Sequence, residues 1–420
     1  MSALLLLMLQ LSLVLAAAKA CGAVLRRLGQ PPVIGEMAGG LLLGPLAFGA
    51  WLPHAHAAVF PADSLPVLSG LGTLGAALFM FIMGAELRAP DGTRAQLRAA
   101  VSIGGVGIAA PLALGLAVAP ALYPRFAPDG VGYWPFALFV AAAISVTAFP
   151  VLARILRDRG LARSTPGRLA LGAGLVNDAV VWIFLAAVLA VAGGGSGRAV
   201  AATAAGAVVL AGVAFRWLRP LYARLLRPAA GDGAPSSSAL VPVLLGLLGC
   251  AAFSEWIGLH AIFGAFVFGA CLPRDDRILA WCVRAIEPLA IGLLMPVMFA
   301  VAGQHATPEA FGAMGAGVFA LLLAVAISGK LAGCAAGARL CGHGWRDSLA
   351  VGALMNARGL MELIVIRIGY DAGLIGPELF TMLFALTLVT TVMASPLLSL
   401  LYRGTPWPAP AAAIAPERNA

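Results

Sequence analysis

Apolar stretches long enough to cross a bilayer recur along the whole chain, separated by short runs of arginine, glycine and proline. A helix needs about 20 apolar residues to cross about 30 Å of hydrocarbon. Of the 420 residues, 61% are hydrophobic and only 11% are charged, which is more apolar surface than one soluble core could bury. The sequence therefore predicts an all-α polytopic membrane protein.

Thirteen segments of this kind are expected to form transmembrane helices. They lie near residues 3–25, 34–52, 66–87, 99–122, 134–154, 165–193, 199–216, 238–256, 259–273, 286–303, 309–339, 347–370 and 377–402. The first lacks a basic lead and a small-residue cleavage site, so we expect it to remain as a span.

The arginine distribution predicts the orientation of these spans. With the N-terminus outside, most of the 27 basic residues fall in cytoplasmic loops, and only Arg125 and Arg198 lie outside. Basic residues collect on the cytoplasmic side of membrane proteins. We therefore expect a multi-pass protein of the bacterial inner membrane with a cytoplasmic C-terminus, and the net charge of +9 needs no nucleic-acid partner.

A polar linker divides the chain near its middle. The segment 227–238 contains GDGAPSSS, and two sets of apolar segments flank it. Many transporters build a midplane site from two inverted repeats with broken helices, and we expect that arrangement here. The membrane domain is expected to cover residues 1–403, followed by a short cytoplasmic tail at 404–420.

Four charged residues fall deep within predicted spans: Asp178, Lys330, Arg358 and Glu362. A charge at the centre of a span costs roughly 2.5–3.5 kcal/mol on insertion scales, so such residues usually line an ion path or pair with one another. Ten residues separate Asp178 from the inner end of its helix, about 15 Å at 1.5 Å per residue. Asp178 is therefore expected at the midplane, and Lys330 at a similar depth on another helix.

A lone acid at this depth can bind a proton or a cation in turn, because either ligand neutralises a carboxylate that burial disfavours. The alternative is that Asp178 only pairs with a basic residue. Lys330 is either a structural clamp or a second proton carrier. Arg358 and Glu362 are four residues apart on one helix face, which favours a structural ion pair.

Helix-breaking signals lie at the same depth in two spans. SVTAFP at 145–150 carries a proline within a span, and NARG at 356–359 carries a polar run with a glycine. Unwound backbone at membrane depth is tolerated where it lines a cavity, and its carbonyl groups can bind a cation. Both segments are therefore predicted to break their helices.

These residues lie within seven motifs that occur in a characteristic order. They are PPVIGEMAGGLLLGP (31–45), FMFIMGAELR (79–88), AISVTAFPVLARIL (143–156), GLVNDAVVW (174–182), HAIFGAFVFGACLPR (260–274), ISGKLAGC (327–334) and LMNARGLMELIVIRIGYDAGLI (354–375). In these motifs the sequence resembles the monovalent cation:proton antiporter-2 family, which includes bacterial sodium/proton antiporters and plant cation/proton exchangers.

The resemblance implies a sodium/proton antiporter fold that acts as a homodimer. A core domain, about 99–193 and 309–402, would carry two broken helices that cross. A scaffold and dimer domain would cover about 1–87 and 199–303, and the core would move past it like an elevator.

The resemblance also implies a binding site without any cofactor. Asp178 would be the shared proton and cation ligand, with Asn177 beside it and Thr147 helping to hold a monovalent metal cation, Na+ or K+. Lys330 would face this site.

The sequence departs from electrogenic members of this family. Those carry two adjacent aspartates where this chain has Asn177 and Asp178, and electroneutral relatives generally carry arginine where this chain has Lys330. Some relatives place an acid where Ala148 follows the threonine. Stoichiometry and the choice between sodium and potassium therefore stay open.

Two other transport functions are alternatives, a cation-coupled symporter of an organic solute and a potassium efflux channel. The sequence contains no TVGYG-like selectivity filter, which argues against a channel. No nucleophile and base share a motif, so the protein is not expected to be an enzyme.

Overall fold

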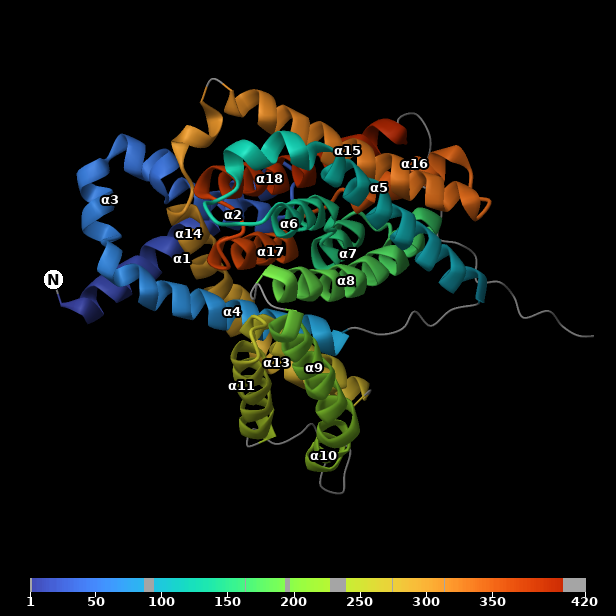
Figure 1. Cartoon of the computed structure of the whole chain (residues 1–420), viewed down its shortest axis with the longest axis horizontal. Helices are drawn as coiled ribbons and strands as arrows, with labels where there is room; N and C mark the ends of the chain where they lie inside the picture. Colours follow the sequence, from blue (N-terminus) through green and yellow to red (C-terminus); the bar gives the residue numbers. More distant parts are fainter. Residues whose placement is uncertain are drawn as a thin grey trace, which may run out of the picture.

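The computed structural model describes residues 2–86, 94–162, 164–192, 197–226, 239–273, 275–312 and 314–402, and every regular element within these ranges is helical (Figure 1). The helices of the first half are α1 (Ala3–Arg27), α2 (Pro32–Leu42), α3 (Pro53–Val59), α4 (Leu65–Glu86), α5 (Arg94–Phe126), α6 (Tyr133–Ser145), α7 (Phe149–Asp158), α8 (Thr165–Ala192), α9 (Gly197–Val213) and α10 (Arg219–Leu225). Those of the second half are α11 (Leu240–Trp256), α12 (Ala261–Cys271), α13 (Asp276–Leu289), α14 (Met295–Gln304), α15 (Gly315–Leu340), α16 (Trp345–Met355), α17 (Leu360–Asp371) and α18 (Pro377–Leu401).

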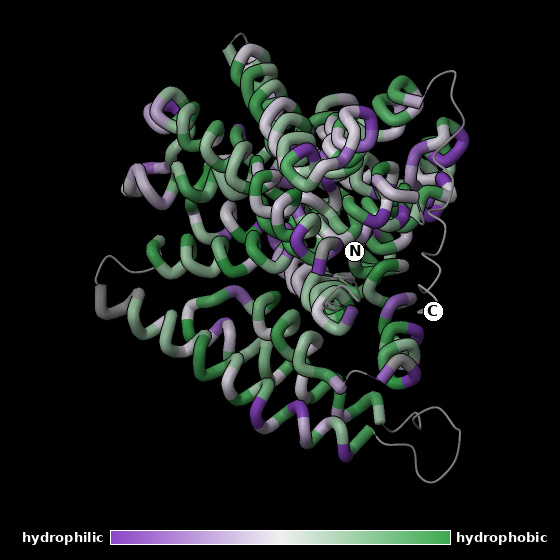
Figure 2. Tube along the Cα trace, turned by 90° about the vertical axis from the view of Figure 1, so that its right-hand side faces the viewer, coloured by the Kyte–Doolittle hydropathy of each residue, from purple (hydrophilic) through white to green (hydrophobic). Residues whose placement is uncertain are grey.

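The helices are apolar along most of their length (Figure 2). Within the described residues, 9 helical segments are long and apolar enough to cross a bilayer, and the bent pair of α16 and α17 makes up to 10. The apolar helices α2, α11 and α12 are shorter, with 11, 17 and 11 residues. The all-helical membrane fold is confirmed, whereas the count of thirteen spans is not.

One of the short segments shows why the count differs. The span predicted at 34–52 ends as an α-helix at Leu42, and Pro45 begins a short π-helix. Gly44 lies between them with its Cα directly against the carbonyl group of Gly303 in α14. The helix therefore ends where the chain makes a close backbone contact.

Helices α5, α6, α7 and α8 pack together with α15, α16 and α18, and α17 packs against α6 and α18. We call this set the first group; it lies at the upper right of Figure 1. Its longest contact joins α5 to α15 through a stripe of small residues. Gly329 meets Pro111, Gly333 meets Ala110, and Gly337 meets Ile103.

The same contacts show that α5 and α15 run antiparallel, because residue numbers rise along α15 as they fall along α5. Each is followed by a broken helix and then a long helix: α6, α7 and α8 after the first, α16, α17 and α18 after the second. The two broken helices therefore enter the bundle from opposite faces, as inverted repeats require.

Replacing Gly333 with leucine should destabilise the protein, because a Cβ there would lie 2.8 Å from both Ala110 Cβ and the Val106 carbonyl oxygen. Overpacking of this kind costs about 1–3 kcal/mol. Thermal unfolding in detergent would measure it. Gly317→Leu on the same helix is the control, because a Cβ there would have no neighbouring atom of the described residues within 4 Å. Equal midpoints for the two variants would contradict this role of the stripe.

Helices α1, α2, α4, α12, α13 and α14 form a second group, to which α11 is attached through α12. Close backbone contacts again set the packing, with Gly84 of α4 against the Phe266 carbonyl and Gly269 of α12 against the Phe81 carbonyl. Helices α9, α10 and α11 project at the bottom of Figure 1. The predicted linker at 227–238 and the tail at 404–420 lie outside the described residues.

Candidate functional site

Both predicted helix breaks are present. Helix α6 ends at Ser145 and α7 begins at Phe149, with Val146 and Ala148 in extended conformation. Pro150 lies in the first turn of α7, where its missing N–H costs no hydrogen bond. Helices α16 and α17 are separated by residues 356–359 and meet at an angle of 47°. The SVTAFP and NARG signals therefore located the breaks correctly.

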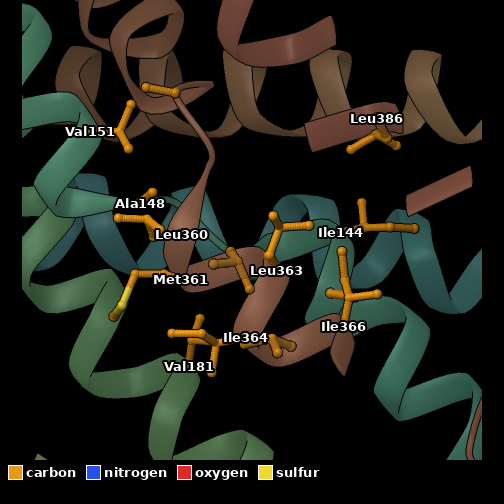
Figure 3. Close-up of a cluster of buried hydrophobic side chains, with 14 of the residues drawn as sticks. Ile144, Ala148, Val151, Val181, Leu360, Met361, Leu363, Ile364, Ile366 and Leu386 are labelled. Atoms are coloured by element: carbon orange, nitrogen blue, oxygen red, sulfur yellow. The ribbon is translucent and has the colours of Figure 1, made fainter. Parts of the chain in front are cut away.

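The two breaks are bonded to each other. The N–H of Ala148 donates to the Ala357 carbonyl at 3.0 Å, and Thr147 Oγ1 donates to the Met355 carbonyl at 3.0 Å. Figure 3 shows the apolar shell at this crossing, including Ala148 and Leu360. The surrounding side chains are almost fully buried, so backbone groups freed by the breaks have to be satisfied within the protein.

Asn177 of α8 holds the first break from both sides. Its Oδ1 accepts a hydrogen bond from the Thr147 N–H at 2.9 Å, and its Nδ2 donates to the Ser145 carbonyl at 3.4 Å. Both ends of the amide are in use. A carboxylate at this position would keep the first bond and lose the second, because it has no donor.

Asp178 lies beside Asn177 on α8 and is only 6% exposed. The backbone N–H of Phe149, at the start of α7, hydrogen bonds to its carboxylate. Its Oδ1 is buried without a hydrogen-bond partner, and it forms no ion pair with any residue that the structure describes. The alternative in which Asp178 only pairs with a basic residue therefore finds no partner here.

Lys330 of α15 is fully buried and points to backbone carbonyl groups. Its Nζ donates to the Gly107 carbonyl of α5 at 3.0 Å and to the Ser145 carbonyl at the end of α6. Lys330 and Asp178 form no ion pair among the described residues, and the Ser145 carbonyl joins Lys330 to Asn177, the neighbour of Asp178 in the chain.

Arg358 and Glu362 form an ion pair with an Nη1–Oε1 distance of 2.6 Å, and both are fully buried. Arg358 also donates to the carbonyls of Ala143 and Ile144 in the last turn of α6. Arg358 and Lys330 therefore place two positive charges at the C-terminal end of a half-helix, where the helix dipole is negative.

Thr391 of α18 belongs to this network and was not predicted. Its Oγ1 accepts a hydrogen bond from the Arg358 N–H at 2.9 Å and lies 2.9 Å from the Arg358 carbonyl oxygen. The available signal was the cluster of hydroxyl groups at Thr387, Thr390 and Thr391 in an otherwise apolar helix, all of them buried.

A funnel of about 690 Å³ leads toward Asp178 between the two helix groups. Its walls come from α1, α2 and α4 on one side and from α7 and Leu360 on the other. A separate cavity of about 10 Å³ touches Asp178 and shares Met83, Glu86 and Phe149 with the funnel wall. That volume is about one water molecule, and Asp178 lines this cavity but is not among the residues that line the funnel.

Toward the opposite face the two groups are in contact. Arg367 of α17 pairs with Asp371 at 2.8 Å and donates to Ser69 Oγ of α4 at 3.1 Å. A cavity of only about 20 Å³ remains there. His305, just after α14, packs against Tyr370 with ring centroids 4.8 Å apart and the rings tilted by 47°, and burial lowers the pKa of His305 to about 4. Among the described residues, the space between the two groups is thus wide at the face of Arg26 and Arg154 and narrow at the face of Arg367.

Within the described residues, no three histidine, cysteine, aspartate or glutamate side chains are grouped so that they could hold a metal ion. A monovalent cation needs no such group, because carbonyl and hydroxyl oxygens also serve it. The carboxylate of Asp178, the Thr147 hydroxyl and the freed carbonyls of the breaks supply oxygen of this kind.

Comparison with known proteins agrees with this architecture. The family model described as "Sodium/hydrogen exchanger, transmembrane" matches residues 12–403. The Na(+)/H(+) antiporter NhaS4 of Synechocystis is 34% identical over 413 residues, covering 97% of this chain and 98% of the relative. Cation/H(+) antiporter 17 of Arabidopsis thaliana is 36% identical over 404 residues, covering 95% of this chain and 48% of the relative.

K(+)/H(+) antiporter 1 of Saccharomyces cerevisiae is 33% identical over 389 residues, covering 89% of this chain and 44% of the relative. The chain therefore spans about half the length of the plant and yeast relatives. The solved structure of the sodium proton antiporter MjNhaP1 from Methanocaldococcus jannaschii has a TM-score of 0.69 at 16% identity, covering 96% of this chain and 99% of the other, which shows a shared fold. The chain belongs to the sodium/hydrogen exchanger family of membrane transporters.

Proposed function

We propose that this protein exchanges Na+ or K+ for H+ across the membrane, with Asp178 as the shared site. The observation that carries the proposal is a buried carboxylate with an unpartnered oxygen at the crossing of two broken helices. The relatives named as Na(+)/H(+) and K(+)/H(+) antiporters support the same reaction.

The chemistry follows from the cost of burying a bare carboxylate. In this apolar shell Asp178 is more stable with a bound proton or a bound cation than with neither. The two ligands compete for the same oxygen atoms, so one must leave before the other binds. Thr147 Oγ1, which already donates to Met355, keeps lone pairs that can face a cation. Competition at one site couples the two ion movements without a separate gate for each.

Exchange also requires that the site meet each face of the membrane in turn. The funnel supports access from one face, and the Arg367–Ser69 contact closes the other. Both features lie between the two helix groups, so sliding the first group against the second would close the funnel and open the far side. This is elevator-type alternating access with the first group as the moving core and the second as the scaffold.

The funnel face carries Arg26, Arg154 and Arg157, and we assign it to the cytoplasm of a bacterial inner membrane with the N-terminus outside. The structure is then inward-open. The homodimer implied by the family resemblance stays a prediction, which cross-linking in membranes would test.

The site supports exchange of one proton for one cation. Asn177 has no proton to exchange, and both ends of its amide are used at the first break. Lys330 donates to two carbonyl groups instead of pairing with Asp178, which is the role of a clamp. That leaves Asp178 as the single group that changes its ligand, and the exchange is electroneutral.

Lys330→Ala should therefore lower stability without changing the exchange ratio. The Gly107 carbonyl would be left buried without the Lys330 donor, at a cost of about 1–3 kcal/mol, and the Ser145 carbonyl would keep only its hydrogen bond from Asn177 Nδ2. Lys330→Arg keeps donors at this position and should retain more stability than Lys330→Ala. Thermal unfolding and the voltage dependence of exchange would be measured together. Voltage dependence of exchange in the unchanged protein that disappears when Lys330 is replaced would instead identify Lys330 as a proton carrier.

The direct test is reconstitution in liposomes that contain a pH-sensitive dye. A proton gradient is imposed, sodium or potassium is added, and the voltage is clamped with an ionophore or left free. Cation-driven loss of the gradient that is the same under both conditions would support electroneutral antiport and identify the ion. Cation flux without proton movement would favour a channel, and proton-independent uptake of an organic solute with the cation would favour a symporter.

A further inference from the structure

A second chamber opens beside the funnel, at the same face of the membrane. It has a volume of about 520 Å³ and shares Arg26, Pro32 and Arg154 with the funnel wall. One side is formed by the end of α1 and the connection to α2, and the other by α7 and Ser395 of α18. The chamber therefore lies between the second helix group and the first.

Its charge differs from that of the funnel. Three arginines line it, Arg26, Arg154 and Arg159, and none of the described lining residues is acidic. The funnel lining, in contrast, includes acidic residues, Glu36, Glu86 and Glu287, in addition to its basic residues. Three guanidinium groups around one small volume repel each other and any cation. The chamber is unsuited to the transported ion and suited to an anion.

Hydrogen bonds position two polar residues of the chamber wall, Gln30 and Arg159. Gln30 donates through Nε2 to the Val392 carbonyl at 3.3 Å, and its Oε1 is buried with no hydrogen-bond partner among the described residues. Arg159 donates from Nη1 to Ser399 Oγ at 3.3 Å, which orients the guanidinium at the chamber wall. Three guanidinium groups around one chamber fit a ligand that carries phosphate oxygens.

We propose that this chamber binds a phosphate group, carried by the headgroup of an anionic phospholipid or by a free phosphate compound. Guanidinium groups bind phosphate through paired N–H donors, and basic pockets between transmembrane helices on the cytoplasmic side suit lipid headgroups. The ligand would join α1 and α2 to α7 and α18. Because these elements belong to the two groups that slide in the proposed cycle, the ligand would hold the inward-open arrangement.

The binding test is independent of transport. The purified full chain in neutral detergent at low ionic strength is heated with phosphatidylglycerol, phosphatidylcholine or inorganic phosphate. We expect phosphatidylglycerol or phosphate to raise the unfolding midpoint. In the double variant Arg26→Gln/Arg159→Gln, the apparent affinity for the stabilising anion should fall roughly 30-fold, because each arginine near the surface contributes about fivefold. Stabilisation by phosphatidylglycerol alone would identify the lipid, and equal stabilisation by inorganic phosphate would identify a free anion.

The matched control is Arg27→Gln/Arg168→Gln, which removes the same charge from residues that are exposed and do not line the chamber. It should keep the affinity of the unchanged protein. Equal losses in the two double variants would overturn the proposal in favour of general surface charge, and so would the absence of stabilisation by any anion. Neither result depends on whether Asp178 carries ions.

Discussion

Asp178→Asn is expected to abolish cation-driven proton movement in proteoliposomes while leaving the protein folded. Asparagine has nearly the same shape, and Phe149 N–H, which now hydrogen bonds to the carboxylate, can donate to its carbonyl oxygen. It has neither a proton to release at physiological pH nor a charge to neutralise a bound cation. The signal should fall to that of empty liposomes with both sodium and potassium.

Asp63→Asn is the control for this prediction, because Asp63 is an exposed aspartate in the short 3-10 helix before α4 and lies outside the candidate site. It should exchange ions like the unchanged protein. Gel filtration and thermal unfolding would show that the Asp178 variant is folded, and the loss of one buried carboxylate should keep or raise its stability. Substantial exchange by a folded Asp178→Asn protein would contradict its assignment as the shared site.

The main features of the fold could be predicted from the sequence because they depend on local properties, namely apolar runs and helix-breaking residues. Apolar runs indicated membrane helices, and Pro150 and the NARG segment indicated where two of them break. A break at membrane depth is costly unless its backbone groups find partners, so the polar residues around it were informative. Lys330 was singled out by its depth in a predicted span and Asn177 by the family resemblance, but their hydrogen-bond partners were not predicted.

What the sequence did not predict depends on long-range contacts. The Ser145 carbonyl accepts from both Lys330 and Asn177, but a backbone carbonyl has no signature in a sequence. Thr391 meets Arg358 across 33 positions of chain, and the stripe from Gly329 to Gly337 becomes informative only once α5 is known to lie against it. The end of α2 at Leu42 likewise lies beside a contact that is distant in sequence, that of Gly44 with the Gly303 carbonyl, and the predicted number of spans stays unconfirmed.

The buried pair of Arg358 and Glu362 should be the most sensitive point for stability. Arg358→Met removes the partner of a fully buried carboxylate and the donors to the last carbonyls of α6. Breaking a buried pair from one side costs about 3–5 kcal/mol, because the remaining charge is left without compensation. Chemical or thermal unfolding in detergent would show a large decrease, whereas Lys19→Met, which breaks an ion pair whose lysine is 64% exposed, should cost at most about 1 kcal/mol.

The double variant Arg358→Met/Glu362→Leu separates the two contributions. It removes the stranded carboxylate, so it should be more stable than Arg358→Met alone, but the Ala143 and Ile144 carbonyls would still lack their donor. The residual loss therefore measures what Arg358 contributes to the end of α6, and the difference between the variants measures the ion pair. If Arg358→Met were no less stable than Lys19→Met, the pair would not hold the second break, and another contact, such as that of Thr391, would have to do so.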